Sequence, residues 1–171
     1  MHVNKVQGYQ IRKAYGNEST SIIHMLKEVA RWLKKNEIDQ WQYLLEGGDD
    51  DEIVEAIMNG MTYVVLKENE VIATFTVSPK QSEWDRHIFG EEEISHSLYI
   101  HRLAVVPNYM GTGIGKGILR WIEENRESDK KYLKLDCVAN NTKLHHFYEN
   151  NGFELLGITD GHSKFSKYVS G

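Results

Sequence analysis

Four glycines that alternate with other residues form the clearest chemical feature of the sequence. Gly111, Gly113, Gly115 and Gly117 follow the apolar segment SLYIHRLAVV and lead into a helical pattern. A glycine-rich turn at the N-terminus of a helix presents bare backbone N–H groups, and the helix dipole adds to their attraction for an anion. The run therefore predicts a site for a phosphate or pyrophosphate group, although a tight turn that binds nothing also fits these residues.

Two common phosphate-binding motifs do not fit this run. Lys116 occupies the third glycine position of the dinucleotide fingerprint G-x-G-x-x-G, which makes that motif a weak match. The P-loop G-x-x-x-x-G-K-[ST] needs one more residue before its Gly-Lys pair, and Gly117 stands where its hydroxyl residue should follow. A small NTPase is therefore the less favoured interpretation.

Apolar spacing predicts the elements that would position the run. Helices are expected at residues 19–35, 52–58, 114–124 and 141–151, and strands at 8–14, 97–106, 132–139, 153–159 and 164–170. Residues 62–79 read as a hairpin around a polar turn, and the segment with Trp84 and the acidic run 91–93 reads as a loop. We expect one α/β (α+β mixed) domain over residues 8–171, after a short extension at 1–7, with a central mixed sheet of about six or seven strands flanked by helices.

Composition limits the classes of function. The 171 residues are 40% hydrophobic and 26% charged, as in ordinary globular proteins, and the formal net charge is −5. No basic block indicates nucleic-acid binding, no apolar stretch is long enough for a bilayer, and the first residues do not resemble a signal peptide. With Cys137 as the single cysteine, no internal disulfide can form. We expect a cytoplasmic protein with no nucleic-acid or membrane partner.

The segment AVVPNYMGTGIGKGIL resembles the acyl-CoA-binding segment of the GNAT family of N-acetyltransferases. That segment has the form [QR]-x-x-G-x-[GA] between a strand and a helix, and Met110, Gly113 and Gly115 fill its defining positions. Met110 stands where the family usually has Arg or Gln. The backbone amides of residues 110–116 do not depend on that side chain, and Lys116 would supply the local positive charge.

A second segment, LDCVANNTKLHHFYENNGFELLG, is similar to another CoA segment of this family. There an asparagine opens a helix that carries a tyrosine and is followed by Gly-Phe, and the matching residues here are Asn141, Tyr148, Gly152 and Phe153. The order of the predicted elements also agrees with the GNAT fold over nearly the whole chain.

The resemblance implies acetyl-CoA as the cosubstrate and direct transfer without a metal. The residues that it implies for binding this cosubstrate are Leu103, Ala104, Val105, Met110, Gly111, Thr112, Gly113, Ile114, Gly115, Lys116, Asn141 and Tyr148. In the family, the backbone N–H at the position of Leu103 polarises the acetyl carbonyl.

Tyr148 is the candidate general acid. A phenol with a pKa of about 10 can protonate a thiolate whose conjugate acid has a pKa of about 8.5, as in cysteine. The resemblance implies that Tyr148 lies beside the sulfur of CoA. Without it, a packed aromatic side chain on an amphipathic helix would be the simpler interpretation.

His101 is the candidate general base. Strand alternation places it on the same face as Tyr99, Leu103 and Val105, and an ordinary histidine titrates near neutral pH. In the family, residues two or four positions before the polarising N–H often take the proton of the amine. A strand histidine satisfied by its neighbours is the alternative, and Tyr99 and the acidic run 91–93 are further candidates for the base.

The remaining reactive side chains indicate little chemistry. His145 and His146 are adjacent on a helix and therefore face different sides, so we expect no metal site. Trp32, Trp41 and Tyr43 could form an acceptor-binding wall, as the first helices do in this family, although aromatic residues there fit the core at least as well, and Tyr99 is a further substrate-binding candidate.

The sequence thus predicts an acyltransferase, an acetyl-CoA-dependent N-acetyltransferase that acts on a primary amine of a small molecule or peptide, and it allows a homodimer. A non-catalytic module that binds acyl-CoA is the alternative. The small NTPase and a nonenzymatic interaction domain are less favoured.

Overall fold

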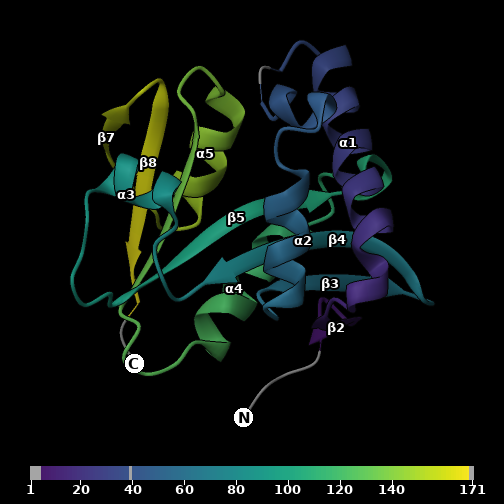
Figure 1. Ribbon diagram of the computed structural model, residues 1–171, viewed down its shortest axis with the longest axis horizontal. Helices are drawn as coiled ribbons and strands as arrows, with labels where there is room; N and C mark the ends of the chain where they lie inside the picture. The colour runs from purple at the N-terminus through teal and green to yellow at the C-terminus, as the bar shows by residue number, and fades with distance from the viewer. Residues whose placement is uncertain (1–4, 39, 170–171) are drawn as a thin grey trace. The chain divides into compact units, whose positions relative to one another are not determined.

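Eight strands form one mixed sheet in the computed structural model, which describes residues 5–38 and 40–169 (Figure 1). The strand order is β1-β2-β3-β4-β5-β6-β8-β7. The strands are β1 (Lys5–Val6), β2 (Tyr9–Lys13), β3 (Thr62–Lys67), β4 (Glu70–Ser78), β5 (Ser97–Val105), β6 (Tyr132–Val138), β7 (Glu154–Thr159) and β8 (His162–Tyr168). The α-helices are α1 (Ser19–Lys35), α2 (Asp50–Met58), α3 (Glu83–Phe89), α4 (Ile114–Asn125) and α5 (Thr142–Asn150). The predicted mixed α/β fold is confirmed.

Strand β1 raises the number of strands above the predicted six or seven. Its two residues, Lys5 and Val6, lie in the stretch that the sequence indicates to be an extension, and they pair antiparallel with Gln10 and Tyr9. Residues 1–4 and 170–171 lie outside the described residues. The start of the predicted extension falls on the first of these segments, and the ends of the predicted last strand and of the predicted domain fall on the second.

Contacts along the chain cluster into two compact units. The first contains residues 1–76 and 102–122, and the second contains residues 77–101 and 123–171. Strand β5 contributes its first half to the second unit and its second half to the first. The prediction of a single acetyltransferase domain over residues 8–171 stays a prediction.

In the first unit, helices cover both faces of the sheet. The β3–β4 hairpin turns through Glu68 and Asn69, whose φ angles of 50° and 71° suit the twist of a two-residue hairpin. Val64 and Leu66 pack with the apolar residues of α1 and α2 on one face. On the other face, Tyr63 and Phe75 contact the ring of Trp121 on α4.

The second unit is built on β6, which has different neighbours on its two sides. It pairs antiparallel with β8 from Tyr132 to Val138, whereas the parallel ladder with β5 covers only Ser97–Tyr99 and Tyr132–Lys134. Tyr148 of α5 packs on Phe165 on one face of this part of the sheet, and Trp84 of α3 contacts Asp136 on the other face.

Helix α3 corrects the expectation of a loop around Trp84. Ser82 begins it with a capping box, in which its hydroxyl accepts from the N–H of Asp85 and the carboxylate of Asp85 accepts from the N–H of Ser82. Apolar spacing gives little sign of so short a helix, but the sequence Ser-x-x-Asp is the mark of such a cap. Within residues 5–38 and 40–169, no helix is long and apolar enough to cross a bilayer.

Gly117 supplies a test of the close packing between α4 and β1. A Cβ atom at this position would lie 2.9 Å from Cγ1 of Val6 and 3.1 Å from Cγ of Gln7. We expect Gly117→Val to lower the free energy of unfolding by about 1–3 kcal/mol, because β1 must move. Urea denaturation measures the change, with Arg120→Val on the exposed part of the same helix as control. Equal stability of the two variants would mean that β1 moves at no cost.

Candidate active site

The glycine turn of the first unit connects β5 to α4. Gly111 has a φ angle of 78°, and the space where its Cβ would stand is open. Helix α4 begins at Ile114, and Lys116 is exposed in its first turn. The first N–H groups of a helix have no partner within the helix. The turn therefore presents bare backbone donors, an accessible glycine and one cation to an approaching anion.

Two glycines of the run have a packing reason as well. Gly113 has a φ angle of 90°, its carbonyl accepts a 3.0 Å hydrogen bond from Nε2 of Gln7, and a Cβ there would lie 2.9 Å from the same nitrogen. Gly117 lies against Val6 and Gln7. Sequence reasoning assigned Gly113 only to the cosubstrate because nothing local indicates that the N-terminal residues pack here.

Arg102 interrupts the regular course of β5. Its φ angle is 49°, a left-handed conformation that is uncommon for a residue with a side chain. Its guanidinium donates a 2.8 Å hydrogen bond to Oδ2 of Asp49, and both side chains are largely buried. The predicted alternation that places His101 and Leu103 on one face does not hold through Arg102.

The other predicted binding residues of the first unit lie mainly in apolar surroundings. Ala104 belongs to the core beside α1 and α2, and Met110 and Trp41 pack against this core. The N–H of Met110 donates to the carbonyl oxygen of Pro107 at 3.2 Å. Leu103, Val105 and Trp32 are partly exposed.

His101 forms a pair with a carboxylate in the second unit. Its Nε2 lies 3.1 Å from Oδ2 of Asp85, whose side chain is 1% exposed, whereas that of His101 is 19% exposed. Asp85 was missed by the sequence reasoning because α3 was read as a loop.

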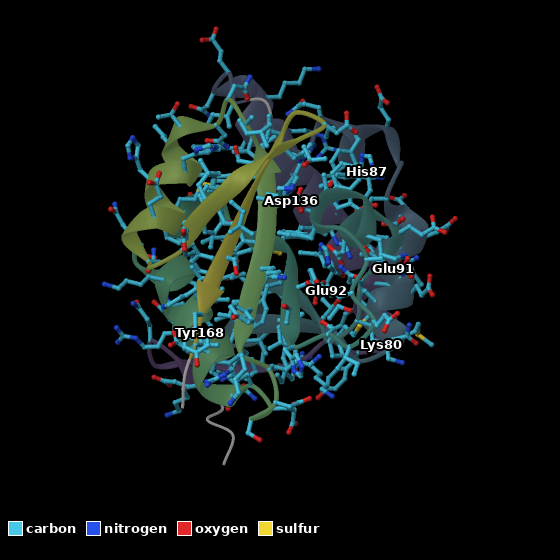
Figure 2. The ribbon with its side chains drawn as sticks, turned by 90° about the vertical axis from the view of Figure 1, so that its left-hand side faces the viewer. Lys80, His87, Glu91, Glu92, Asp136 and Tyr168 are labelled. Atoms are coloured by element: carbon cyan, nitrogen blue, oxygen red, sulfur yellow. The ribbon has the colours of Figure 1, made fainter. Side chains whose placement is uncertain are left out.

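A second carboxylate, Asp136 on β6, lies close to this pair. Its Oδ2 accepts a 3.1 Å hydrogen bond from Nε1 of Trp84. Nδ1 of His162 is 3.0 Å from the same oxygen, within ion-pair distance but without the direction of a hydrogen bond. Burial raises the pKa of Asp136, and Asp85 adds to the rise, while Trp84, His162 and His101 oppose it. Figure 2 shows Asp136 on β6, on the side where His87 and Glu92 also lie.

Tyr99 is completely buried next to these groups. Its hydroxyl contacts Nε2 of Gln81 at 3.0 Å, and its ring packs edge-on against Phe89. Burial, with the nearby charge of Glu92, raises its pKa to about 12. In this structure it offers no surface to an acceptor and little capacity as a base.

Tyr148 lies on α5, on the face of the second unit opposite α3. The rings of Phe147, Phe153 and Phe165 surround it, and it is 7% exposed. Burial raises its pKa above the usual value, and Cys137 adds to the rise. Asn141 begins the same helix, with its side-chain oxygen accepting from the N–H of Leu144 at 3.2 Å.

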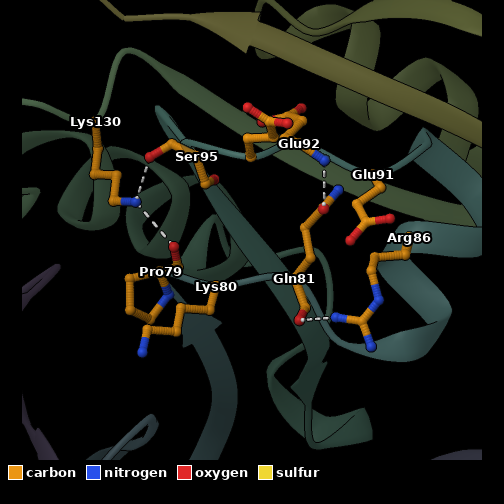
Figure 3. Close-up of a pocket in the computed structure, with 9 residues that line it drawn as sticks. Pro79, Lys80, Gln81, Arg86, Glu91, Glu92, Ser95 and Lys130 are labelled. Atoms are coloured by element: carbon orange, nitrogen blue, oxygen red, sulfur yellow. Dashed lines mark hydrogen bonds between the residues drawn. The ribbon is translucent and has the colours of Figure 1, made fainter.

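A cavity of about 410 Å³ opens beside α3 in the second unit (Figure 3). Acidic and basic side chains line it in equal number, and its lining residues are Pro79, Lys80, Gln81, Arg86, Glu91, Glu92, Glu93, Ser95 and Lys130. The buried ammonium group of Lys130 donates to the carbonyl oxygens of Pro79 and Ser95. Glu92 is 2.6 Å from Nζ of Lys134. Several of the charges are therefore already satisfied by the protein itself.

Among the described residues, no group of three or more His, Cys, Asp or Glu side chains is arranged to hold a metal ion. The histidine–carboxylate contacts at His101 and His162 are each made with a single aspartate. Their geometry is that of ion pairs or hydrogen bonds.

Comparison with known proteins agrees with the resemblance seen in the sequence. Residues 58–155 match the model of the acetyltransferase (GNAT) domain. An uncharacterized N-acetyltransferase of Bacillus subtilis, YesJ, is 34% identical over 165 residues, which cover 95% of this chain and 92% of that protein. The chain belongs to the GNAT family of acetyltransferases.

Solved structures show the same fold. A GNAT-family acetyltransferase of Listeria monocytogenes superposes with a TM-score of 0.83 at 24% identity, covering 96% of this chain and 98% of that one. The PaiA N-acetyltransferase of Thermoplasma acidophilum, solved in complex with coenzyme A, gives a TM-score of 0.74 at 17% identity, covering 94% and 98%.

Asp136 supplies a test of what its burial costs. The pKa of Asp136 is higher in the folded protein than its ordinary value. Folding therefore takes up a proton at pH values between the ordinary and the raised pKa, and the folded protein loses stability as the pH rises through this range. We expect Asp136→Asn, which keeps an acceptor for Trp84, to raise the thermal unfolding midpoint at neutral pH, with a gain that vanishes in acid.

The matched control is Asp160→Asn, because the side chain of Asp160 is 65% exposed and removing its charge relieves no burial. A lower midpoint for Asp136→Asn at neutral pH would contradict this account. It would mean that the carboxylate, by its contacts with Trp84 and His162, stabilises the folded protein more than its burial destabilises it.

Proposed function

We propose that the protein transfers an acetyl group directly from acetyl-CoA to a primary amine of a small molecule or peptide. The observation that carries the proposal is the open glycine turn at the start of α4 in a chain of the GNAT family. The coenzyme A complex of the Thermoplasma relative supports the choice of cosubstrate.

The turn fits the pyrophosphate of CoA by the character of its donors. Gly111 leaves its backbone approachable, and the amides from Gly111 to Lys116 carry no bulky group at the glycine positions. The N-terminus of α4 adds a favourable dipole, and the exposed Lys116 adds a charge. The apolar packing of Met110 means that backbone amides, rather than its side chain, would hold the phosphates.

Bound acetyl-CoA supplies a thioester, whose carbonyl carbon forms the new C–N bond as its C–S bond breaks. The left-handed Arg102 supports a part for the neighbouring amide in this step. An irregularity in a strand leaves backbone groups without their usual ladder partner. We infer that the N–H of Leu103 is such a group and polarises the acetyl carbonyl.

Tyr148 would donate a proton to the departing thiolate. Burial raises the pKa of this phenol, but it also raises the pKa of the neighbouring Cys137 thiol, to about 12. Surroundings that disfavour a phenolate therefore disfavour a thiolate too.

His101 would accept the proton of the attacking amine. It is the partly exposed member of its pair with Asp85, so a small molecule could reach its ring. A general base of this kind contributes about 10²- to 10⁴-fold to a rate.

Calorimetry with acetyl-CoA and with ATP, followed by a screen of amines that records release of free thiol, tests the proposal. We expect acetyl-CoA binding and thiol release that depends on a primary amine. Binding of acetyl-CoA with no turnover on any amine would favour a non-catalytic acyl-CoA module. Binding of ATP alone would contradict the proposal.

Gly115→Val tests the phosphate contact. Gly115 lies in the first turn of α4, where valine is a better helix former than glycine, so we expect the fold to be kept. A branched side chain beside these amides should weaken CoA binding by about tenfold or more, equivalent to about 1.4 kcal/mol. Calorimetry measures the affinity, with Arg120→Val as control. Unchanged affinity in Gly115→Val would remove the turn from the site.

Tyr148→Phe tests the general acid. It keeps the buried ring and removes the proton, so we expect turnover to fall by about 10²-fold while CoA affinity changes little. Tyr132→Phe is the matched control, because Tyr132 is 40% exposed on β6. If turnover survives in Tyr148→Phe while chemistry limits the rate, another group protonates the thiolate.

A further inference from the structure

We propose that Asp85 is a positioning residue that fixes which nitrogen of His101 accepts the proton of the amine and holds the ring in place. The inference rests on the proposed function, in which His101 is the base. It adds Asp85 to the residues that act in the transfer. Asp85 lies on α3, outside the glycine turn and outside the two CoA segments of the family.

Asp85 is fixed more firmly than a simple ion-pair partner needs to be. The capping box ties its N–H to Oγ of Ser82 at 3.1 Å and its Oδ2 to the N–H of Ser82 at 3.0 Å. The residue is 0% exposed, and Ile88 in the next turn is buried as well. The carboxylate therefore cannot follow His101 if the ring turns, and it defines the direction that Nε2 must face.

The contact determines the tautomer of the imidazole. An ionised carboxylate can only accept hydrogen bonds, so the nitrogen that faces it, Nε2 at 3.1 Å from Oδ2, carries a proton. Nδ1 is then the nitrogen with a free lone pair. During transfer, the proton of the amine moves to Nδ1, the Nε2 proton stays where it is, and Asp85 stabilises the positive ring without taking a proton. Release of the Nδ1 proton to water restores the base.

A purely structural explanation of Asp85 does not account for its charge. The cap and the contact with His101 both use Oδ2, and Oδ1 is buried with no hydrogen-bond partner. A buried acceptor without a partner costs free energy of folding. Asparagine could accept the same bond from Ser82, so the cap does not require a carboxylate, whereas an anionic partner for a positively charged His101 does require one.

Other charged groups surround the pair and must be considered in any pH dependence. Asp136 on β6 acts electrostatically on both His101 and Asp85, and His162 on β8 lies beside Asp136. From β5 and the loop before it, Tyr99 and Glu92 also face this region. Asp85 differs from all of these groups because the structure gives it a direct contact with the ring.

The first experiment compares the kcat of Asp85→Asn, His101→Gln and the double variant. We expect Asp85→Asn to lower kcat by about tenfold to 10²-fold, because the ring that accepts the proton of the amine loses its anionic partner. The double variant should be no slower than His101→Gln, since Asp85 acts through His101. Glu83→Gln, which removes a carboxylate from the same turn of α3, is the control and should match the wild type.

The second experiment reads the tautomer directly by ¹⁵N NMR of the histidine rings, and it needs no activity. We expect His101 to carry its proton on Nε2 in the wild type and to lose this preference in Asp85→Ala, which leaves no acceptor opposite Nε2, while Glu83→Gln keeps it. A tautomer that is unchanged in Asp85→Ala, or effects of Asp85→Asn and His101→Gln on kcat that simply add, would overturn the inference. A wild-type protein that turns over no amine would refute the proposed function instead, and the NMR result would still decide the pairing.

Discussion

The conformation of one residue, Arg102, is the constraint on which the arrangement of β5 depends. A left-handed residue with a long side chain costs about 1–3 kcal/mol in a strand and persists only where the surroundings fix it. Here the side chain of Arg102 is held by a largely buried ion pair with Asp49, at 2.8 Å. The residues before Arg102 belong to the second unit and carry His101, whereas those after it belong to the first and lead to the glycine turn. One strand therefore supplies both kinds of candidate site residue.

The second unit combines this strand with buried polar groups that a core selected for stability alone would not contain. Asp85 is wholly buried, and Asp136 is a largely buried carboxylate with a raised pKa. Each such group costs free energy of folding, and residues of this kind concentrate where a protein acts on a ligand. Their position around His101, rather than their number, makes this side of β6 the candidate for amine chemistry.

The sequence was sufficient where the pattern is long and regular. The spacing of Ile114, Ile118, Leu119 and Ile122 predicted α4, and these residues are buried as expected. The alternating residues around the turn at Glu68 and Asn69 predicted the hairpin, and the two CoA segments identified the family.

The sequence was insufficient where a feature depends on distant partners. The seven residues of α3 are too few to show a helical period, so Asp85 went unnoticed. Nothing in the residues next to Arg102 predicts its left-handed backbone, and the partner of its side chain, Asp49, is far away along the chain. The packing of Gly113 on Gln7 is hidden in the same way.

Direct transfer to an amine is the central claim, and a labelled acetyl group tests it most directly. The protein would be mixed with acetyl-CoA labelled in its acetyl group and with an amine in whose presence the protein releases free CoA thiol. The products would be analysed by mass spectrometry. The account predicts that the label appears on the nitrogen of the amine and never on the protein. Label on a side chain such as Cys137, or label found only in free acetate, would contradict it.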